Sequence, residues 1–274
     1  MRALAGLVVA LGLVLLSSSA DAKSQRPVKH PPAKHQKQRT GKLGKPRSTN
    51  ARAARISAIR AHDRLEPREV SSRPSGQSVG APWDGYLLHA TELPPGDGYV
   101  IRRPWRAFGT ATTVEIVERA IGATLDAFPD THVLAIGDIS AESGGAITQH
   151  RSHQSGRDVD VGLFYLEQPA GYPDSFIHAD DRNLDCAATF KLIESFLAST
   201  SDDGGVQMIF LDFDVQGILY AWAQDHGVSE RRLERIFQYP HGRGASEGLV
   251  RHEPNHDNHM HVRFRCSADD SACQ

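Results

Sequence analysis

Histidine and aspartate side chains gather in two short segments of the chain, residues 150–160 (HRSHQSGRDVD) and residues 256–263 (HDNHMHVR). Imidazole and carboxylate groups are common ligands of catalytic zinc, where three protein ligands leave a fourth position for water. A single histidine is more often a surface or core residue than a ligand, and H-x-H is common by chance. The concentration of several such residues in two segments nevertheless favours a metal site.

The second segment overlaps a strand that we predict over Asn258–Arg265. Because side chains alternate between the two faces of a strand, His259, His261 and Arg263 would share one face. The other face would carry the apolar side chains that anchor the strand in the core: Met260, Val262 and Phe264. A row of imidazole and guanidinium groups makes a poor core and is suited to lining a polar cleft.

The first segment leads into a strand predicted over Val159–Leu166. The glycine of the SGR tripeptide permits a tight turn before this strand, and Asp158 and Asp160 would then share a face. One sheet could therefore bring three side chains to a common point: His153, Asp160 and His261. The sequence thus predicts a zinc site held by two imidazoles and one carboxylate.

Such a site has a definite chemistry. Zinc lowers the pKa of a bound water from about 9 for the aqueous ion to about 7, so a hydroxide nucleophile exists at neutral pH. His259, on the same strand face as a predicted ligand, would take a proton or stabilise the oxyanion. His256 and His150 are close enough in sequence to hydrogen-bond the ligands or the water.

Helices and strands connect the two segments in an irregular order. Val114, Val117 and Ile121, for example, recur at helical spacing. We predict helices over Thr112–Phe128, Ala187–Ala198, Ile218–Asp225 and Glu230–Phe237, and further strands over His132–Ile139 and Val206–Leu211. The absence of a regular βαβ rhythm favours an α+β fold. We expect a single domain with a small, mainly antiparallel sheet flanked by helices.

The N-terminus has the pattern of an export signal. Arg2 precedes an apolar run over residues 3–16, and the ADA tripeptide ending at residue 22 fits a cleavage site. The run is shorter than the roughly 20 residues of a membrane-spanning helix. We therefore expect residues 1–22 to be a cleaved signal peptide, and the mature protein to be periplasmic or released, without stable membrane insertion.

Charge divides the remaining chain into two parts. Residues 23–73 hold 15 Lys and Arg against 3 Asp and Glu, whereas residues 74–274 hold 15 against 29. The basic part is poor in aromatic residues and cannot bury enough apolar surface to offset its ordering entropy. We predict a disordered linker over residues 23–77, with an electrostatic tether to an anionic envelope polymer as the functional alternative. The folded domain is predicted over residues 78–274.

The three cysteines all lie beyond the predicted signal peptide. Export permits a disulfide, and Cys266 and Cys273 are near enough in sequence for a short closing loop that leaves Cys186 as a thiol. A pairing that involves Cys186 is also compatible with the sequence. No C-x-x-C pair occurs, which argues against a thiolate zinc site.

The histidine segments resemble the penicillin-insensitive murein endopeptidases, a family in the LAS group of zinc metallopeptidases. The likeness runs from about residue 78 to residue 273 and is strongest in the two segments, at IGD (136–138) and at GG (144–145). The family pattern is a His, six residues and an Asp, followed far downstream by H-x-H. His153, Asp160 and the HMH of residues 259–261 satisfy it.

This resemblance implies a zinc endopeptidase that cleaves D-alanyl–diaminopimelate cross-links of peptidoglycan without a serine nucleophile. It implies roles for residues of both segments: His153, Asp160, His261 and His150 in the metal site, and His259 and His256 in catalysis. The basic segment lies outside the family pattern, and residues 167–206 match it weakly. Within that weakly matching part, His178 and Asp181 are candidates for a second metal site.

Other functions compete with this interpretation. Another murein peptidase, such as a D,D-carboxypeptidase or an L-alanyl-D-glutamate endopeptidase, would use the same zinc geometry but give different products. A non-catalytic zinc module would bind the cell wall or a partner, although His259 beside a ligand argues for catalysis. A metal-storage protein, suggested by the 14 histidines, would bind more than one or two ions. Nucleic acid is not an expected partner of an exported chain without a recognition motif, and the sequence does not define the oligomeric state.

Overall fold

The computed structural model describes residues 76–274. The predicted signal peptide (1–22) and nearly all of the predicted linker (23–77) lie outside the described residues. The first strand, β1, begins at Gln77, one residue before the predicted start of the folded domain.

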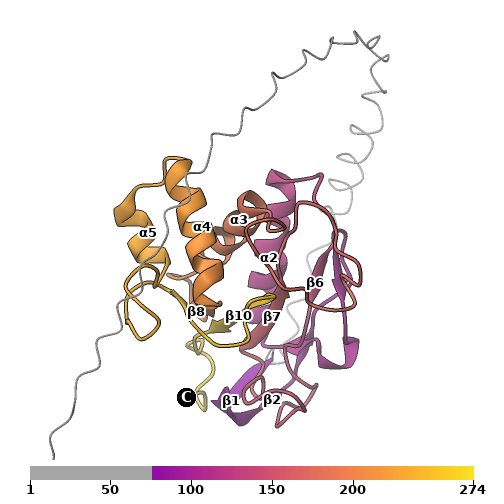
Figure 1. Cartoon of the computed structure of the whole chain (residues 1–274). Coiled ribbons are helices and arrows are strands. Elements are labelled where there is room, and N and C mark those ends of the chain that lie inside the picture. Colours follow the sequence, from indigo (N-terminus) through magenta and orange to yellow (C-terminus); the bar gives the residue numbers. More distant parts are fainter. Residues whose placement is uncertain (1–75) are drawn as a thin grey trace, which may run out of the picture. The chain divides into compact units, whose positions relative to one another are not determined.

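A six-stranded mixed sheet lies at the centre of the described chain (Figure 1). Its strands, in spatial order, are β4 (Tyr99–Ile101), β6 (Leu134–Ile136), β7 (Asp158–Gly162), β10 (His259–Phe264), β8 (Val206–Phe210) and β9 (Val250–Arg251). The pairs β6–β7, β7–β10 and β10–β8 are antiparallel, and the outer pairs β4–β6 and β8–β9 are parallel. The mainly antiparallel sheet is therefore confirmed, with the predicted C-terminal strand at its centre.

Helices cover the sheet on the side where its apolar residues lie. They are α2 (Ala111–Ala127), α3 (Cys186–Leu197), α4 (Phe213–Asp225) and α5 (Glu230–Ile236), and Figure 1 shows α2, α3 and α4 grouped together. The side chains of Thr110 and Asp185 cap α2 and α3 by accepting hydrogen bonds from first-turn N–H groups. The α+β class is confirmed. None of the helices in residues 76–274 has the length and hydrophobicity that a membrane span requires.

Strand alternation divides the central sheet into an apolar and a polar face. The apolar residues of β7 and β10 are fully buried in the core: Val159, Val161, Met260 and Val262. The residues that alternate with them carry the polar groups: Asp158, Asp160, His259 and His261. The helices pack on the first face, which leaves the second for the site.

Several short elements have no counterpart in the sequence-based predictions. These are the edge strands β4 and β9, the hairpin of β1 (Gln77–Ala81) and β2 (Asp84–Leu88), the pair of β3 (Thr91–Glu92) and β5 (Phe108–Gly109), and the 3-10 helix η1 (Pro104–Arg106). Two to five residues carry too little periodicity to be recognised in a sequence. The β1–β2 hairpin nevertheless supports the site, because its Pro82 carbonyl accepts a hydrogen bond from the N–H of Gln154 (3.0 Å).

Three predicted elements differ in extent, and one of them is the strand predicted over Val159–Leu166, which ends at Gly162. Helix α4 begins at Phe213, five residues before its predicted start, because Asp212 caps it there with its side chain. The strand predicted over His132–Ile139 is reduced to β6. The His132 ring precedes β6, where its Nε2 accepts a hydrogen bond from the N–H of Tyr165 (2.9 Å) and fixes a loop instead of extending the strand.

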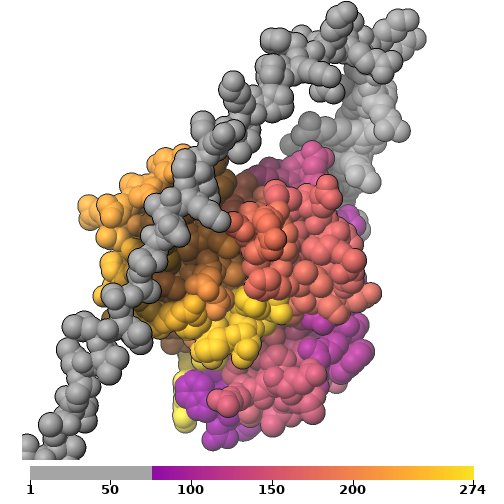
Figure 2. All heavy atoms as spheres, in the orientation of Figure 1, coloured from indigo at the N-terminus to yellow at the C-terminus, as the bar shows by residue number. Residues whose placement is uncertain are grey.

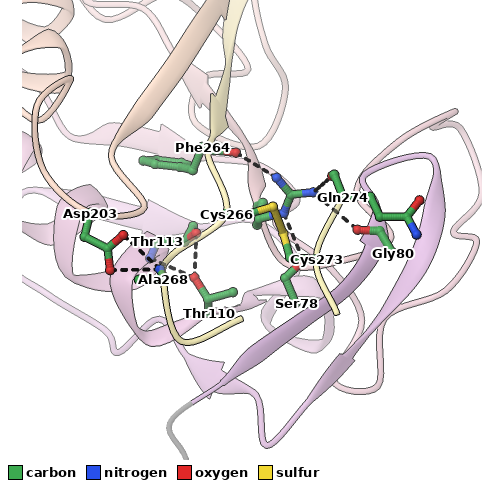
Figure 3. Close-up of a disulfide and its surroundings, with 11 residues drawn as sticks. Ser78, Gly80, Thr110, Thr113, Asp203, Phe264, Cys266, Ala268, Cys273 and Gln274 are labelled. Atoms are coloured by element: carbon green, nitrogen blue, oxygen red, sulfur yellow. Dashed lines mark hydrogen bonds between the residues drawn. A yellow bond between two sulfur atoms is a disulfide. The ribbon is translucent and has the colours of Figure 1, made fainter. Parts of the chain in front are cut away.

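The C-terminal segment is closed by a disulfide between Cys266 and Cys273, which confirms the predicted short loop. Figure 3 shows it beside Ser78 of β1 and the C-terminal Gln274. Cys186 is a free, half-buried thiol at the start of α3, and burial raises its pKa to about 11.

One buried guanidinium ties this closure to the sheet. Arg157 donates hydrogen bonds to Ser78 Oγ (2.9 Å) and to the carbonyl oxygens of Phe264 (3.2 Å) and Gln274 (2.6 Å). Only 3% of Arg157 is exposed. Burial lowers the pKa of the guanidinium, an effect that the neighbouring Asp158 carboxylate opposes. A single side chain thus joins the first strand, the end of β10 and the C-terminus.

We predict that Arg157→Met lowers the free energy of unfolding by about 2–4 kcal/mol, because it leaves several buried acceptors without a donor. Urea denaturation followed by circular dichroism measures the change. Arg182→Met is the control, because Arg182 is an exposed arginine whose partner within residues 76–274 is nearby Asp180, and solvent-exposed pairs contribute little to stability. Equal destabilisation by the two variants would contradict the assignment.

Candidate metal centre

The register of β7 and β10 brings the two histidine segments together. In the antiparallel ladder His261 lies directly opposite Asp160. His153 lies in the loop before β7, where Gly156 adopts φ +72°, as the predicted tight turn requires. The three predicted ligands therefore come from one strand, its preceding loop and the neighbouring strand.

The potential ligand atoms of these three side chains form a nearly equilateral triangle. His153 Nε2 is 3.2 Å from Asp160 Oδ1, His261 Nδ1 is 3.3 Å from the same oxygen, and the two nitrogens are 3.3 Å apart. Ligands bound to zinc at about 2.0–2.2 Å in a tetrahedron are separated by about 3.3–3.5 Å. The donor set matches one face of such a tetrahedron.

Burial supports the same interpretation. The exposed fractions of His153, Asp160 and His261 are 1%, 3% and 7%. Asp160 Oδ1 is buried and accepts no hydrogen bond from any described residue. A buried carboxylate oxygen without a partner is costly, and a cation at the centre of the triangle would stabilise it. The residues therefore fit a metal ion.

Each ligand imidazole is oriented through its other ring nitrogen. His153 Nδ1 is 3.0 Å from the carbonyl oxygen of Ile139, which makes it the donor and leaves Nε2 free for a metal. His261 Nε2 is 3.0 Å from Asp158 Oδ1, which leaves Nδ1 free. Outer partners of this kind fix the orientation of metal-binding histidines and increase their basicity.

The backbone of His153 is held in an unusual conformation. Its φ of +65° lies in the left-handed region, which is uncommon for a residue other than glycine. Its N–H donates to Asp158 Oδ2 (3.0 Å), so the same carboxylate supports both histidine ligands. Strain of this kind persists where surrounding contacts determine the conformation, and it is concentrated at functional sites.

The centre combines strongly coupled charges. Burial disfavours ionisation of Asp158 and Asp160, but the adjacent histidines outweigh it and hold the pKa of both carboxyls well below the usual range. Burial also disfavours the cationic form of His261, yet the two carboxylates raise the pKa of His261 to about 9. Two ionised carboxylates attract a cation, and metal binding would displace the proton from His261.

His259 and His256 lie beside the three predicted ligands. His259 Nε2 is 3.8 Å from Asp160 Oδ1, and its Nδ1 is 2.6 Å from Asn258 Oδ1. Burial lowers the pKa of His259 to about 4, although Asp160 opposes this effect. The His256 ring is 4.7 Å from the His259 ring, and its Nδ1 is 3.0 Å from the carbonyl oxygen of Pro254.

His150 lies between the ligand set and the fully buried Asp138. Its Nε2 is 2.9 Å from Asp138 Oδ2, and its Nδ1 is 3.7 Å from Asp160 Oδ2. Potential ligand atoms of His150, His153 and Asp160 all lie within 4.8 Å of one another. The structure thus brings all six predicted site residues together, while the ligand role of His150 stays a prediction.

The sequence did not reveal the groups that support these residues. Asp158 orients His261, Asp138 binds His150, and two aromatic rings contact the imidazoles: Phe176 on His259 and Phe210 on His261. The D-x-D alternation placed Asp158 on the correct face but gave it no role. Phe176 belongs to a loop without periodicity, so the sequence contains no pattern that would identify it.

The second predicted metal site stays a prediction. His178 Nδ1 is 2.9 Å from Asp257 Oδ2 in an exposed ion pair. His178 and Asp181 both line a cavity of about 450 Å³ with Asp212 and Asp214. Arg243 also lines this cavity, and it pairs with one of the acidic groups, Asp214 (2.9 Å).

Figure 2 shows residues of the C-terminal part, in yellow, at the surface between the orange helical region and the magenta and salmon residues of the earlier chain. The fold and the converging donors together define a candidate metal centre built on the central strands of an α+β protein.

Comparison with known proteins shows which family this chain is similar to. A family model described as penicillin-insensitive murein endopeptidase matches residues 78–194. The penicillin-insensitive murein endopeptidase of Yersinia enterocolitica is 27% identical over 210 residues, which cover 73% of this chain and 70% of the relative. That of Klebsiella pneumoniae is 26% identical over 224 residues, which cover 76% and 74%. The chain therefore resembles this family, as its motifs predicted.

We predict that Asp158→Asn weakens zinc affinity by about 10- to 100-fold, because it loosens the partner that orients His261. Competition with a chromophoric chelator measures the affinity. His226→Ala is the control, because His226 is an exposed histidine stacked on Trp222 and should leave the affinity unchanged. Identical zinc affinities for Asp158→Asn and the wild type would show that Asp158 does not support the metal site.

Proposed function

We propose that the chain is a zinc-dependent endopeptidase that cleaves D-alanyl–diaminopimelate cross-links in peptidoglycan. The observation that carries the proposal is the triangle of His153 Nε2, Asp160 Oδ1 and His261 Nδ1, with a buried oxygen that lacks a hydrogen-bond donor. These three residues would hold the ion. When bound there, zinc would supply Lewis acidity, both to activate water and to polarise the scissile carbonyl.

The histidine beside the ligands is suited to accept a proton. Its Nδ1 lies 2.6 Å from Asn258 Oδ1, a pure acceptor, so His259 carries its hydrogen on Nδ1 and keeps the Nε2 lone pair free. With a pKa of about 4, lowered mainly by burial, the ring is neutral at pH 7. Its Nε2 points to the side of Asp160, where it can take a proton from the attacking water and pass it to the leaving amine.

The substrate class follows from the relatives and from the motifs. The similar proteins of Yersinia and Klebsiella are named penicillin-insensitive murein endopeptidases. Water activated in this site needs no serine nucleophile, which is consistent with indifference to penicillin. Peptidoglycan lies outside the cytoplasmic membrane, so the proposal also requires export, for which the N-terminal residues 1–22 have a suitable sequence. The basic residues 23–73 would favour binding to an anionic wall polymer.

We predict that the mature, zinc-loaded protein converts cross-linked muropeptide dimers into monomers. His153→Ala and the metal-free protein should be inactive, and added zinc should restore only the wild type, because the variant lacks one of three ligands. Digestion of purified peptidoglycan followed by mass spectrometry identifies the bond from the product masses. Release of terminal D-alanine alone would indicate a carboxypeptidase, and no cleavage by the zinc-loaded protein would contradict a hydrolytic role on this polymer.

We predict that His259→Ala lowers kcat by about 10²–10⁴-fold, because it removes the group that transfers the proton. Zinc content should remain stoichiometric, since the three ligands are intact. Steady-state kinetics on a purified dimer and elemental analysis measure the two quantities. Loss of zinc together with activity would instead identify His259 as a ligand.

A further inference from the structure

An aromatic ring covers one face of the His259 imidazole. Phe176 comes from the long connection between β7 and α3, and its ring lies 4.7 Å from the His259 ring, centroid to centroid. The two planes differ by only 8°, so the rings are stacked face to face. The contact therefore restricts rotation of the imidazole about its bond to the strand.

The Phe176 ring is also in contact with a cation. Arg102 Cζ lies 4.3 Å from the ring centroid. The arginine is itself held at both ends: its N–H donates to the Ile136 carbonyl (2.9 Å), and its Nε donates to the Asp174 carbonyl (3.0 Å). Arg102 thus fixes Phe176 to the end of β4 and to its own loop, in an arrangement that also gains from cation–π attraction.

A glycine provides the space for this ring. A Cβ atom at Gly137 would lie 2.9 Å from Phe176 Cζ and 2.9 Å from the Cβ of Asp160. Real side chains essentially never approach so closely. Phe176 therefore packs against the backbone beside Asp160, and any larger residue at position 137 would displace it from the centre.

His259 needs such a support more than the other histidines of the site. His153 has Ile139 as a partner and His261 has Asp158. These two would also be fixed by the metal. His259 has one described hydrogen-bond partner, the adjacent Asn258 side chain, and its Nε2 stands 3.8 Å from Asp160 Oδ1. Rotation of the ring would carry Nε2 away from the position where the proposed proton transfer occurs.

We propose that Phe176, which contacts both Arg102 and His259, is a positioning residue that holds the His259 ring in its working orientation. This rests on the proposed function of His259. Phe176 is only half-buried, so its replacement by leucine removes the flat ring without opening a large cavity in the core. The ring acts through His259 and contributes no atom to the reaction.

The orientation can be measured independently of activity by NMR of the zinc-loaded protein with isotope-labelled histidine. In the wild type, the ring current of Phe176 should shift the His259 ring resonances upfield, and His259→Gln identifies these resonances by their loss. Phe176→Leu should reduce the upfield shift to the part caused by the neighbouring His256 ring, and Phe176→Tyr should retain the full shift. Phe128→Leu, the same change at a half-buried phenylalanine at the end of α2, should leave it unchanged.

The kinetic expectation is a selective loss in kcat. Phe176→Leu should lower kcat on a purified muropeptide dimer by about 10- to 100-fold, with KM within about twofold of the wild type. Phe176→Tyr should recover most of the rate. Zinc content and the melting temperature of each variant are measured alongside, with Phe128→Leu as the control for a lost aromatic side chain.

Unchanged His259 resonances in Phe176→Leu would overturn the inference, as would a kcat no lower than that of Phe128→Leu. Loss of zinc from Phe176→Leu would also overturn it, because the ring would then be a wall of the metal site. If the wild type cleaves no muropeptide, the proposed function fails, but the resonances still decide whether Phe176 positions the imidazole.

Discussion

The pairing of β10 with β7 is the constraint on which the centre depends. Because His261 lies opposite Asp160 in this ladder, a slip of one residue would turn the histidines of β10 into the core and expose Met260 and Val262. Both of these apolar residues are fully buried, so the hydrophobic contacts of the helical face oppose such a slip. The apolar residues on the opposite face of the sheet thus maintain the strand register, and with it the geometry of the polar site.

The polar face shows how a group of buried charges can be stable. Asp158 supports His153 through the backbone and His261 through the ring. The cost of burying the Asp138 carboxylate is offset by its contacts with Arg103, Arg106 and His150. Most members of the network lie beside an oppositely charged neighbour whose own position is fixed, which favours a preorganised site. Four buried atoms of the network nevertheless make no hydrogen bond within the described chain: Arg103 Nε, Asp138 Oδ1, Asp160 Oδ1 and His261 Nε2. Of these, Asp160 Oδ1 lies where the atoms of the three predicted ligands converge.

Sequence patterns predicted the parts of the molecule that are locally encoded. Helical periodicity predicted the bounds of α2 and α3 to within a few residues, and the alternation in residues 258–265 did the same for β10. The positions of the histidines and aspartates on the two predicted strands predicted the three converging donors. The supports were not predictable in this way. Asp138 lies in the IGD motif that supports the family resemblance, but its contact with His150 depends on the order of the strands. Phe176 reaches the site through the course of a long loop, which no local pattern records. The β1–β2 hairpin was missed because its strands are too short for periodicity.

The order of the strands also has a consequence for assembly. The two histidines whose ring nitrogens meet at the centre are separated by 108 residues, and the later one lies on a strand that occupies the middle of the sheet. Residues 78–194, which match the family model, include His153 and Asp160 but not β10, which carries His261. During synthesis, His153 and Asp160 leave the ribosome long before His261. A nascent chain therefore cannot bring the three predicted ligands together until its synthesis is nearly complete.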